Sequence, residues 1–164
     1  MVDISCDSST AYFGDSTSTG MEVEPFSIGS TGLLAPLPTF TNSSGNNSSN
    51  VLLSTDGNTL VVDNNSSLQI TTLAVGTGGA LTYEATTALN NPNVDQSSST
   101  TLITNKGGGR VFMAEQGITG EPGALGLLKV KAGALKEVNG SPSATGDPNS
   151  PAVSIATYPG KVCQ

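Results

Sequence analysis

Several residue types on which catalytic chemistry depends are scarce in this chain of 164 residues. It has no histidine, no tryptophan and a single arginine, Arg110. Histidine is the side chain that most often acts as a general base near neutral pH. A serine or threonine without such a base has nothing to activate it as a nucleophile. The sequence therefore offers no nucleophile–base set, and we predict no catalytic residue in this chain.

Positive charge is also scarce. The chain has six Lys and Arg residues against thirteen Asp and Glu, which gives a net charge of −7. Contacts to phosphate backbones need clustered Lys and Arg, so we do not expect nucleic-acid binding. No apolar run reaches the roughly 20 residues of a membrane span, and no signal-peptide pattern opens the chain. The low lysine content and abundant Ser, Thr and Asn favour an extracytoplasmic location: periplasmic, cell-surface or secreted.

Cysteine is limited to Cys6 and Cys163, near opposite ends of the chain. Two cysteines without histidine do not form a zinc site, and no C-x-x-C redox motif is present. Two alternatives stay open for the pair. They form a disulfide in an oxidising compartment, or they are free thiols packed among apolar residues. We expect no metal and no cofactor.

The chain does contain many short apolar runs separated by turn residues. The stretch Val51–Leu89 reads as four strands joined by "TDGN", "DNNSS" and "GTGG". Asp56-Gly57 is a strong hairpin signal because Gly supplies a positive φ at little steric cost. No window shows sustained helical spacing of apolar residues. The pattern predicts an all-β chain built from antiparallel meanders.

The same strand–turn pattern recurs upstream and downstream of this stretch. Residues that follow the first turn are separated by 48, 51 and 51 positions, and residues that follow the third turn by 47 and 54: Tyr12, Leu60, Val111 and Val162; Leu34, Leu81 and Leu135. Four-stranded units that repeat every 40–50 residues are typical of β-propeller blades. We predict one propeller segment with blades at about 2–50, 51–100 and 101–150 and a partial blade at 151–164.

Several runs also resemble a known family. "GALKEVNGSPSATGDPNSPAVSIATYPGK" (Gly133–Lys161) is similar to the blade junction of lactonase-type seven-bladed propellers. "STDGNTLVVDNN", "GGALTYEATTAL", "DSSTAYFGDS" and "STGLLAPLPTF" match the same blade pattern. The resemblance implies a ring with more blades than this chain supplies. It further implies catalysis by His, Arg and Glu from several blades, and no such residue can be transferred to this sequence.

An open set of about three blades leaves unpaired edges and an uncovered blade face. Three outcomes stay open: the chain is a truncated piece, it assembles with a copy of itself, or a partner chain caps it. In all three cases we expect that the isolated chain is not a well-behaved monomer.

Isolated surface carboxylates are the plain interpretation of the scattered acidic residues, which are Glu22, Glu24, Asp56, Asp63, Glu84, Glu115 and Glu121. Asp56 and Asp63 lack the spacing and closing Glu of an EF-hand, and turn chemistry accounts for them. Arg110 is expected in a solvated or pairing role, and the lysines of the last blade (Lys129, Lys131 and Lys136) are expected on a solvated face. The Asn-x-Ser sequons at Asn42, Asn47, Asn65 and Asn139 are expected by chance in so Asn- and Ser-rich a chain.

These observations favour a non-catalytic β-propeller segment that acts as a structural or protein-binding scaffold. The first alternative is a fragment of a lactonase-like hydrolase whose catalytic residues lie outside this chain. The second is an accessory subunit of a multi-protein complex. The expected partner is a protein, or a second copy, bound through the open blade faces.

Overall fold

The computed structural model describes residues 2–17, 20–42, 48–64, 69–89, 94–105, 107–117, 122–131, 133–144 and 146. Within them lie fourteen strands and one short 3-10 helix. In chain order these are β1 (Val2–Ile4), β2 (Thr10–Thr17), β3 (Gly20–Ile28), β4 (Leu34–Pro36), β5 (Phe40–Asn42), β6 (Ser48–Leu53), β7 (Thr59–Asn64), β8 (Gln69–Val75), η1 (Thr77–Gly79), β9 (Leu81–Ala88), β10 (Val94–Thr104), β11 (Arg110–Gly117), β12 (Ala124–Lys131), β13 (Ala134–Glu137) and β14 (Ser143–Ala144).

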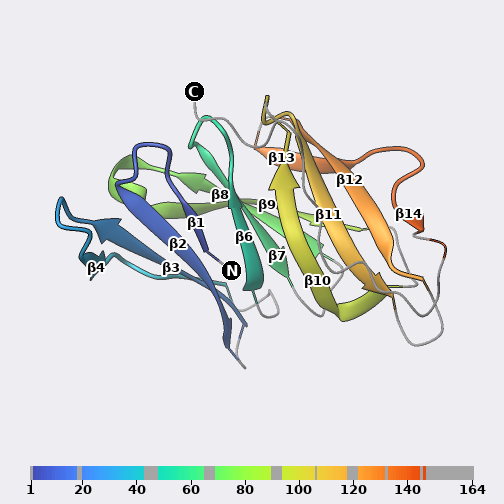
Figure 1. The fold of residues 1–164 in the computed structure, drawn as a ribbon, viewed down its shortest axis with the longest axis horizontal. Helices are drawn as coiled ribbons and strands as arrows, with labels where there is room; N and C mark the ends of the chain where they lie inside the picture. Colours follow the sequence, from blue (N-terminus) through green and yellow to red (C-terminus); the bar gives the residue numbers. More distant parts are fainter. Residues whose placement is uncertain are drawn as a thin grey trace.

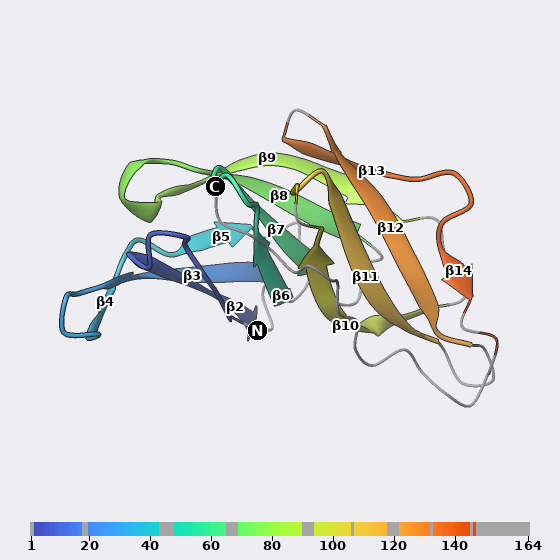
Figure 2. The same cartoon turned by 45° about the horizontal axis from the view of Figure 1, so that its top comes forward.

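The strands form three antiparallel sheets that follow one another along the chain. The first has the order β1-β2-β3-β4, with β5 also paired to β3. The second has the order β6-β7-β8-β9, and the third β10-β11-β12-β13, with β14 paired to β12. Figures 1 and 2 show the sheets stacked face to face, with the second between the other two. The predicted fold class, an all-β partial β-propeller, is confirmed.

The first turn of each sheet has the same hydrogen bonds. In the first sheet the N–H of Ser5 donates to the carbonyl of Thr10, and in the second the N–H of Ser54 donates to that of Thr59. Asn105 makes the corresponding bond to Arg110 in the third sheet. A side-chain oxygen of Ser5, Ser54 or Asn105 accepts from the N–H at the far end of its turn. Short polar side chains thus close all three turns, as turn chemistry requires.

These bonds correct one predicted correspondence. Because Thr10 aligns with Thr59, Tyr12 occupies the position of Val61 and not that of Leu60. The residue that matches Leu60 is Ala11. Side chains alternate between the faces of a strand, so a shift by one residue exchanges the two faces of the sheet. Val162 lies outside the described residues.

The third-turn positions correspond as predicted. Leu34, Leu81 and Leu135 each lie two residues after a glycine with positive φ: Gly32 (80°), Gly79 (81°) and Gly133 (76°). Left-handed backbone of this kind favours glycine because a Cβ would be crowded there.

Two apolar cores lie between the sheets. The first joins Tyr12, Met21 and Val23 of the first sheet to one face of the second, and the other joins the opposite face of the second sheet to the third. Leu60 and Val62 face the first sheet, whereas Val61 between them faces the third, and all three are buried. A strand covered on both faces needs such a continuous apolar run.

Polar contacts also join neighbouring sheets. Asp3 in β1 accepts a 2.7 Å hydrogen bond from the backbone N–H of Leu53 in β6. The hydroxyl of Thr87 in β9 donates to the carbonyl of Leu135 in β13 at 2.8 Å. The first bond links β1 of the first sheet to β6 of the second, and the second links β9 of the second sheet to β13 of the third.

The strand limits differ in detail from the predicted blade limits. β6 begins at Ser48 and β10 at Val94, so each starts a few residues before the predicted boundaries at 51 and 101. The predicted partial blade at 151–164 lies outside the described residues. Within the described part of the chain, no helix has the length and hydropathy of a membrane span.

Candidate functional site

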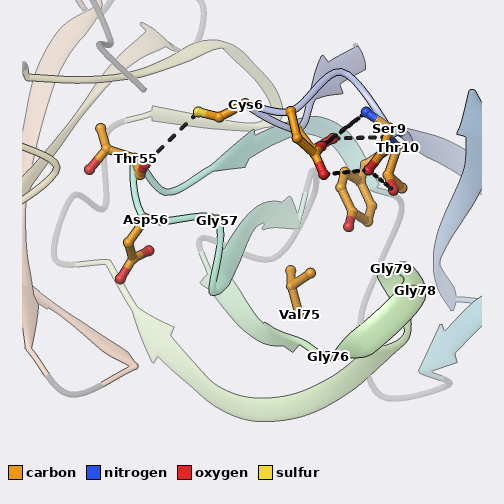
Figure 3. Close-up of a pocket in the computed structure, with 13 residues that line it drawn as sticks. Cys6, Ser9, Thr10, Thr55, Asp56, Gly57, Val75, Gly76, Gly78 and Gly79 are labelled. Carbon is orange, nitrogen blue, oxygen red and sulfur yellow. Dashed lines mark hydrogen bonds between the residues drawn. The ribbon is translucent and has the colours of Figure 1, made fainter. Parts of the chain in front are cut away.

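A pocket of about 530 Å³ lies where the turns of the first two sheets meet. Three segments line it: the β1–β2 turn, the β6–β7 turn and the end of β8 with the loop around η1. Figure 3 shows Ser9 and Thr10 on one side, Thr55 and Asp56 on another, and Val75 between them and the glycine loop. The pocket is therefore a product of sheet packing, since neither sheet forms it alone.

Asp7 in the β1–β2 turn is held by three hydrogen bonds. Its carboxylate accepts from the Ser5 hydroxyl at 2.6 Å, the Ser9 N–H at 3.0 Å and the Ser9 hydroxyl at 2.8 Å. The Ser5 hydroxyl contributes most to lowering the pKa of Asp7 to about 2, and the two Ser9 donors contribute next. Hydrogen bonds to the ionised form stabilise it, so this carboxylate is charged throughout the neutral range.

Asp56 has the same place in the β6–β7 turn. Its carboxylate accepts from the Ser54 hydroxyl at 2.6 Å and from the Asn58 N–H at 3.1 Å. These bonds, the Ser54 hydroxyl first, lower the pKa of Asp56. The pocket therefore has two permanent negative charges on its rim, both engaged by their own turns.

Tyr12 and the glycine loop also line the pocket, where the loop packs against the start of β2. Tyr12 is almost fully buried, and burial raises the pKa of its phenol. A Cβ on Gly79 would lie 3.0 Å from the Thr10 methyl and 3.4 Å from the Tyr12 hydroxyl. Gly79 therefore permits the loop to approach the first sheet this closely.

Cys6 also lines the pocket, and it is disulfide-bonded. No described cysteine is a free thiol. Its sulfur lies 3.9 Å from the carbonyl oxygen of Thr55 (dashed in Figure 3), which is a packing contact because a disulfide sulfur has no proton to donate. Of the two alternatives for the cysteines, the structure selects the disulfide for Cys6. The other cysteine in the sequence, Cys163, lies outside the described residues.

The chemistry of the pocket suits binding better than acid–base catalysis. A carboxylate whose pKa is about 2 is a weak base near neutral pH. Two fixed negative charges also disfavour phosphate and carboxylate groups, whereas neutral hydroxyl-bearing or cationic groups meet no such repulsion. Among the described residues, no group of three potential metal ligands occurs.

The structure distributes the predicted carboxylates widely. Only Asp56 lies in the pocket. Glu22 and Glu24 lie in β3, Asp63 is buried in β7, and Glu84 is exposed in β9. Glu84 approaches the third sheet, since a Cβ on Gly133 would clash with its carboxylate. The side chains of Glu115 and Glu121 lie outside the described residues. Of the described members of this set, Asp56, Asp63 and Glu84 lie in three different elements.

The predicted solvated basic residues lie in the third sheet. Arg110, Lys129 and Lys136 are exposed, and the β-ladder places them side by side across β11, β12 and β13. The expectation of a solvated face is met for these three, while the side chain of Lys131 lies outside the described residues.

The pocket residues Ser5, Asp7 and Ser9 were missed by sequence reasoning. The spacing that they share with Ser54, Asp56 and Asn58 is the signal that could have found them. In each segment this spacing indicates a turn, and the structure has a turn there. A pocket forms only because the two turns, 49 residues apart in the sequence, pack together.

Comparisons with known proteins support the fold of this chain but assign no activity to it. No protein-family model matches the chain, and no curated protein does. Among solved structures, a Lactobacillus plantarum protein aligns with a TM-score of 0.71 and 18% identity. A Bacteroides fragilis protein provisionally assigned as a 6-phosphogluconolactonase aligns at 0.68 and 18%. The periplasmic gluconolactonase PpgL of Pseudomonas aeruginosa aligns at 0.65 and 23%. The fold is thus that of lactonase-like β-propellers.

The alignments cover most of this chain but less than half of each neighbour. They include 88%, 85% and 87% of this chain and 41%, 37% and 40% of the three solved structures, respectively. Identities of 18–23% establish a shared fold, and a shared fold does not by itself establish an activity.

Proposed function

We propose that this chain is a non-catalytic segment of a lactonase-type propeller that serves as a protein-binding scaffold. The observation that carries the proposal is the outer face of the first sheet, which faces away from the second. On it, Val2, Ile4 and Leu34 are 45%, 47% and 50% exposed. Phe13 and Phe26 lie on the same face and form an edge-to-face pair with ring centroids 5.3 Å apart. A contiguous exposed apolar face of this kind marks an interaction surface.

The chemistry of the pocket agrees with this role. Asp7 and Asp56 are engaged as acceptors within their own turns, and their lowered pKa values make them poor proton acceptors. The carboxylates therefore stabilise the scaffold and do not form a general-base pair.

A lactonase fragment is the second candidate. Two of the solved structures that share the fold carry lactonase names, and this chain spans about two fifths of their length. Under this alternative, the reacting groups come from sheets that this chain does not contain. The coding sequence on either side of this segment distinguishes the two, because the alternative requires in-frame sheets with His and Arg.

Hydrolysis of D-glucono-1,5-lactone tests the catalytic claim directly. We expect the rate with the purified chain to equal the buffer rate. A rate that rises in proportion to the amount of protein would overturn the proposal.

The scaffold claim is tested by light scattering coupled to size exclusion. We expect the chain to associate above its mass of 16.4 kDa, and the variant Ile4→Lys/Leu34→Lys to associate less while keeping its β-sheet circular dichroism. Thr82→Lys, at an exposed position in β9, is the control and should associate as the wild type does. Equal association of both variants would contradict the proposed face.

We further propose an extracytoplasmic location. The disulfide at Cys6 supports it, because disulfides persist in oxidising compartments. One neighbour of the same fold is a periplasmic protein. Thiol titration of the denatured protein, taken directly from cells under alkylating conditions, should find no free thiol before reduction.

A further inference from the structure

The outer face of the first sheet is apolar at one end and acidic at the other. Going along β2 from its start, the residues on this side of the strand are Ala11, which is 3% exposed, then Phe13 and Asp15, since Tyr12 faces the core. The β-ladder places Glu24 beside Phe13 and Glu22 beside Asp15. Asp15, Glu22 and Glu24 thus give this end of the face a negative charge, which is complementary to a basic surface.

The outer face of the third sheet has the reverse order. Going along β11 from its start, the residues on this side of the strand are Arg110, Phe112 and Ala114, which is 1% exposed, since Val111 and Met113 face the core. Next to Arg110 the ladder places Lys129 and then Lys136, which forms a basic row across three strands. The following row is Ile103, Phe112 and Leu127, which are apolar and half-buried.

The two faces match when the corresponding strands β2 and β11 run in opposite directions. This half-turn reverses the strand order of one face, so that β12 lies over β2 when β11 lies over β3. Lys129 then meets Asp15, Arg110 meets Glu22, and Leu127 meets Phe13. In both faces the charged row and the aromatic row are two residues apart, or roughly 7 Å along the strand. Sheets that pack face to face align their strand axes within about 30° in either direction.

We propose that the outer face of the first sheet binds the outer face of the third sheet of a second copy, in this antiparallel arrangement. The inference rests on the proposed role of the open sheet faces and names their occupant. Two acidic and two basic side chains then meet beside the apolar contact of Phe13 with Leu127: Asp15 and Glu22 with Lys129 and Arg110.

The arrangement does not close a propeller ring. Ring closure would bring the β10–β11 turn of one copy beside the β1–β2 turn of the next, as the successive sheets of one chain are arranged. The basic row beginning at Arg110 would then face the apolar row of Ile4, Ala11 and Phe26. Because the two surfaces differ and the contact is head-to-tail, association adds one copy after another until the set of copies closes on itself or stays an open chain.

Two charge-reversed variants test the pairing. The first is Asp15→Lys/Glu22→Lys/Glu24→Lys, and the second is Arg110→Glu/Lys129→Glu/Lys136→Glu. Each alone has two outer faces of like charge. We expect each to raise the dissociation constant of the homotypic contact at least about 100-fold, because like-charge contacts across an interface are strongly unfavourable. Sedimentation velocity at low salt measures the change.

Mixing the two variants is the decisive measurement. The mixture again pairs an acidic face with a basic face, so we expect association to return toward the wild-type value and to weaken as salt is added. Thr82→Lys/Ala88→Lys, which adds positive charge in β9, should associate as the wild type does. Circular dichroism and thermal melting confirm that each variant is folded.

Three results would overturn the inference: a wild-type chain that stays monomeric at every concentration, triple variants that associate like the wild type, or a mixture no heavier than its separate components. If Ile4→Lys/Leu34→Lys abolishes association while charge reversal does not, the open face binds as proposed for the function but in another arrangement. Lactone hydrolysis by the chain would instead overturn the proposed function and leave the measured contact standing.

Discussion

The first and third sheets each have a leucine on the face that would contact a preceding sheet, but the two leucines differ in exposure. Leu135 in the third sheet is 5% exposed because it packs against the second sheet, whereas its counterpart Leu34 in the first sheet is 50% exposed. The backbone around them is alike, since each follows a positive-φ glycine by two residues. The difference shows that burial in this fold is set by the neighbouring sheet and not by the sheet's own sequence.

Truncation of these two leucines should give the largest effect on stability, and it tests the difference in burial most directly. Leu135→Ala should lower the free energy of unfolding by about 2–5 kcal/mol, because it removes buried methyl groups and leaves a cavity. Leu34→Ala should cost less than about 1 kcal/mol, since half of that side chain is already in water. Urea denaturation measures both, and similar losses would show that the outer face of the first sheet is covered.

Reduction of the disulfide at Cys6 should have the next largest effect. Cross-links restrict the unfolded chain, and we expect their loss to lower the free energy of unfolding by about 2–4 kcal/mol. Cys6 lies in the turn between β1 and β2, so hydrogen exchange should accelerate in β1 and β2 more than in β7 and β8. Cys6→Ser is the control, since its stability should not respond to reductant. A uniform acceleration in all sheets would contradict a local role.

Two corresponding glycines sharpen the contrast between covered and open turns. Gly57 and Gly108 have positive φ in the second and third sheets, but only Gly108 packs on a neighbouring turn, where a Cβ would clash with the Thr55 hydroxyl. Gly108→Ala should therefore cost about 2–3 kcal/mol, from the left-handed backbone and the overlap together. Gly57→Ala should cost about 1 kcal/mol, from the backbone alone.

Thermal melting of a double-mutant cycle with Thr55→Ala checks this assignment. Removing the threonine hydroxyl should recover part of the Gly108→Ala loss and none of the Gly57→Ala loss. Equal losses at the two glycines would show that the contact between the turns does not matter.

The smallest expected effect is the pH dependence of the first turn. The pKa of Asp7 is about 2, below its ordinary value of 3.8. A carboxyl with a lowered pKa stabilises the folded state above about pH 4, and this contribution is lost as the pH falls through about 2. Melting temperatures between pH 2 and 5 should therefore fall more steeply for the wild type than for Asp7→Asn. Carbon NMR of the carboxyl group checks the pKa itself.

The sequence was sufficient to predict the fold class because turn chemistry is local. Asp56-Gly57 marked the hairpin, and the spacing of Leu34 and Leu81 gave the third turn correctly. The wrong match of Tyr12 to Leu60 also has a physical reason. The residue that corresponds to Leu60 is Ala11, whose small side chain gives a weak apolar signal beside the large aromatic ring of Tyr12.

The pocket and the state of Cys6 were beyond sequence reasoning for a different reason. Each depends on which residues meet in space, and strand periodicity says nothing about which turns become neighbours. Asp7 and Asp56 read as separate turn residues until the packing of two sheets placed both on one rim. Likewise, the spacing of the cysteines could not decide between a disulfide and two thiols.

The hydrogen bond between Asp3 and the N–H of Leu53 has a consequence for how the sheets avoid unwanted pairing. Within the described residues β6 pairs only with β7, which makes it an edge strand. Free backbone donors on an edge invite another strand to add to the sheet. Asp3 occupies the Leu53 donor at 2.7 Å with a side chain from the preceding sheet. The Asp3 carboxylate thus blocks a backbone donor to which another strand would pair. The sheets stack by their faces, while this edge of the second sheet is protected from the addition of a strand.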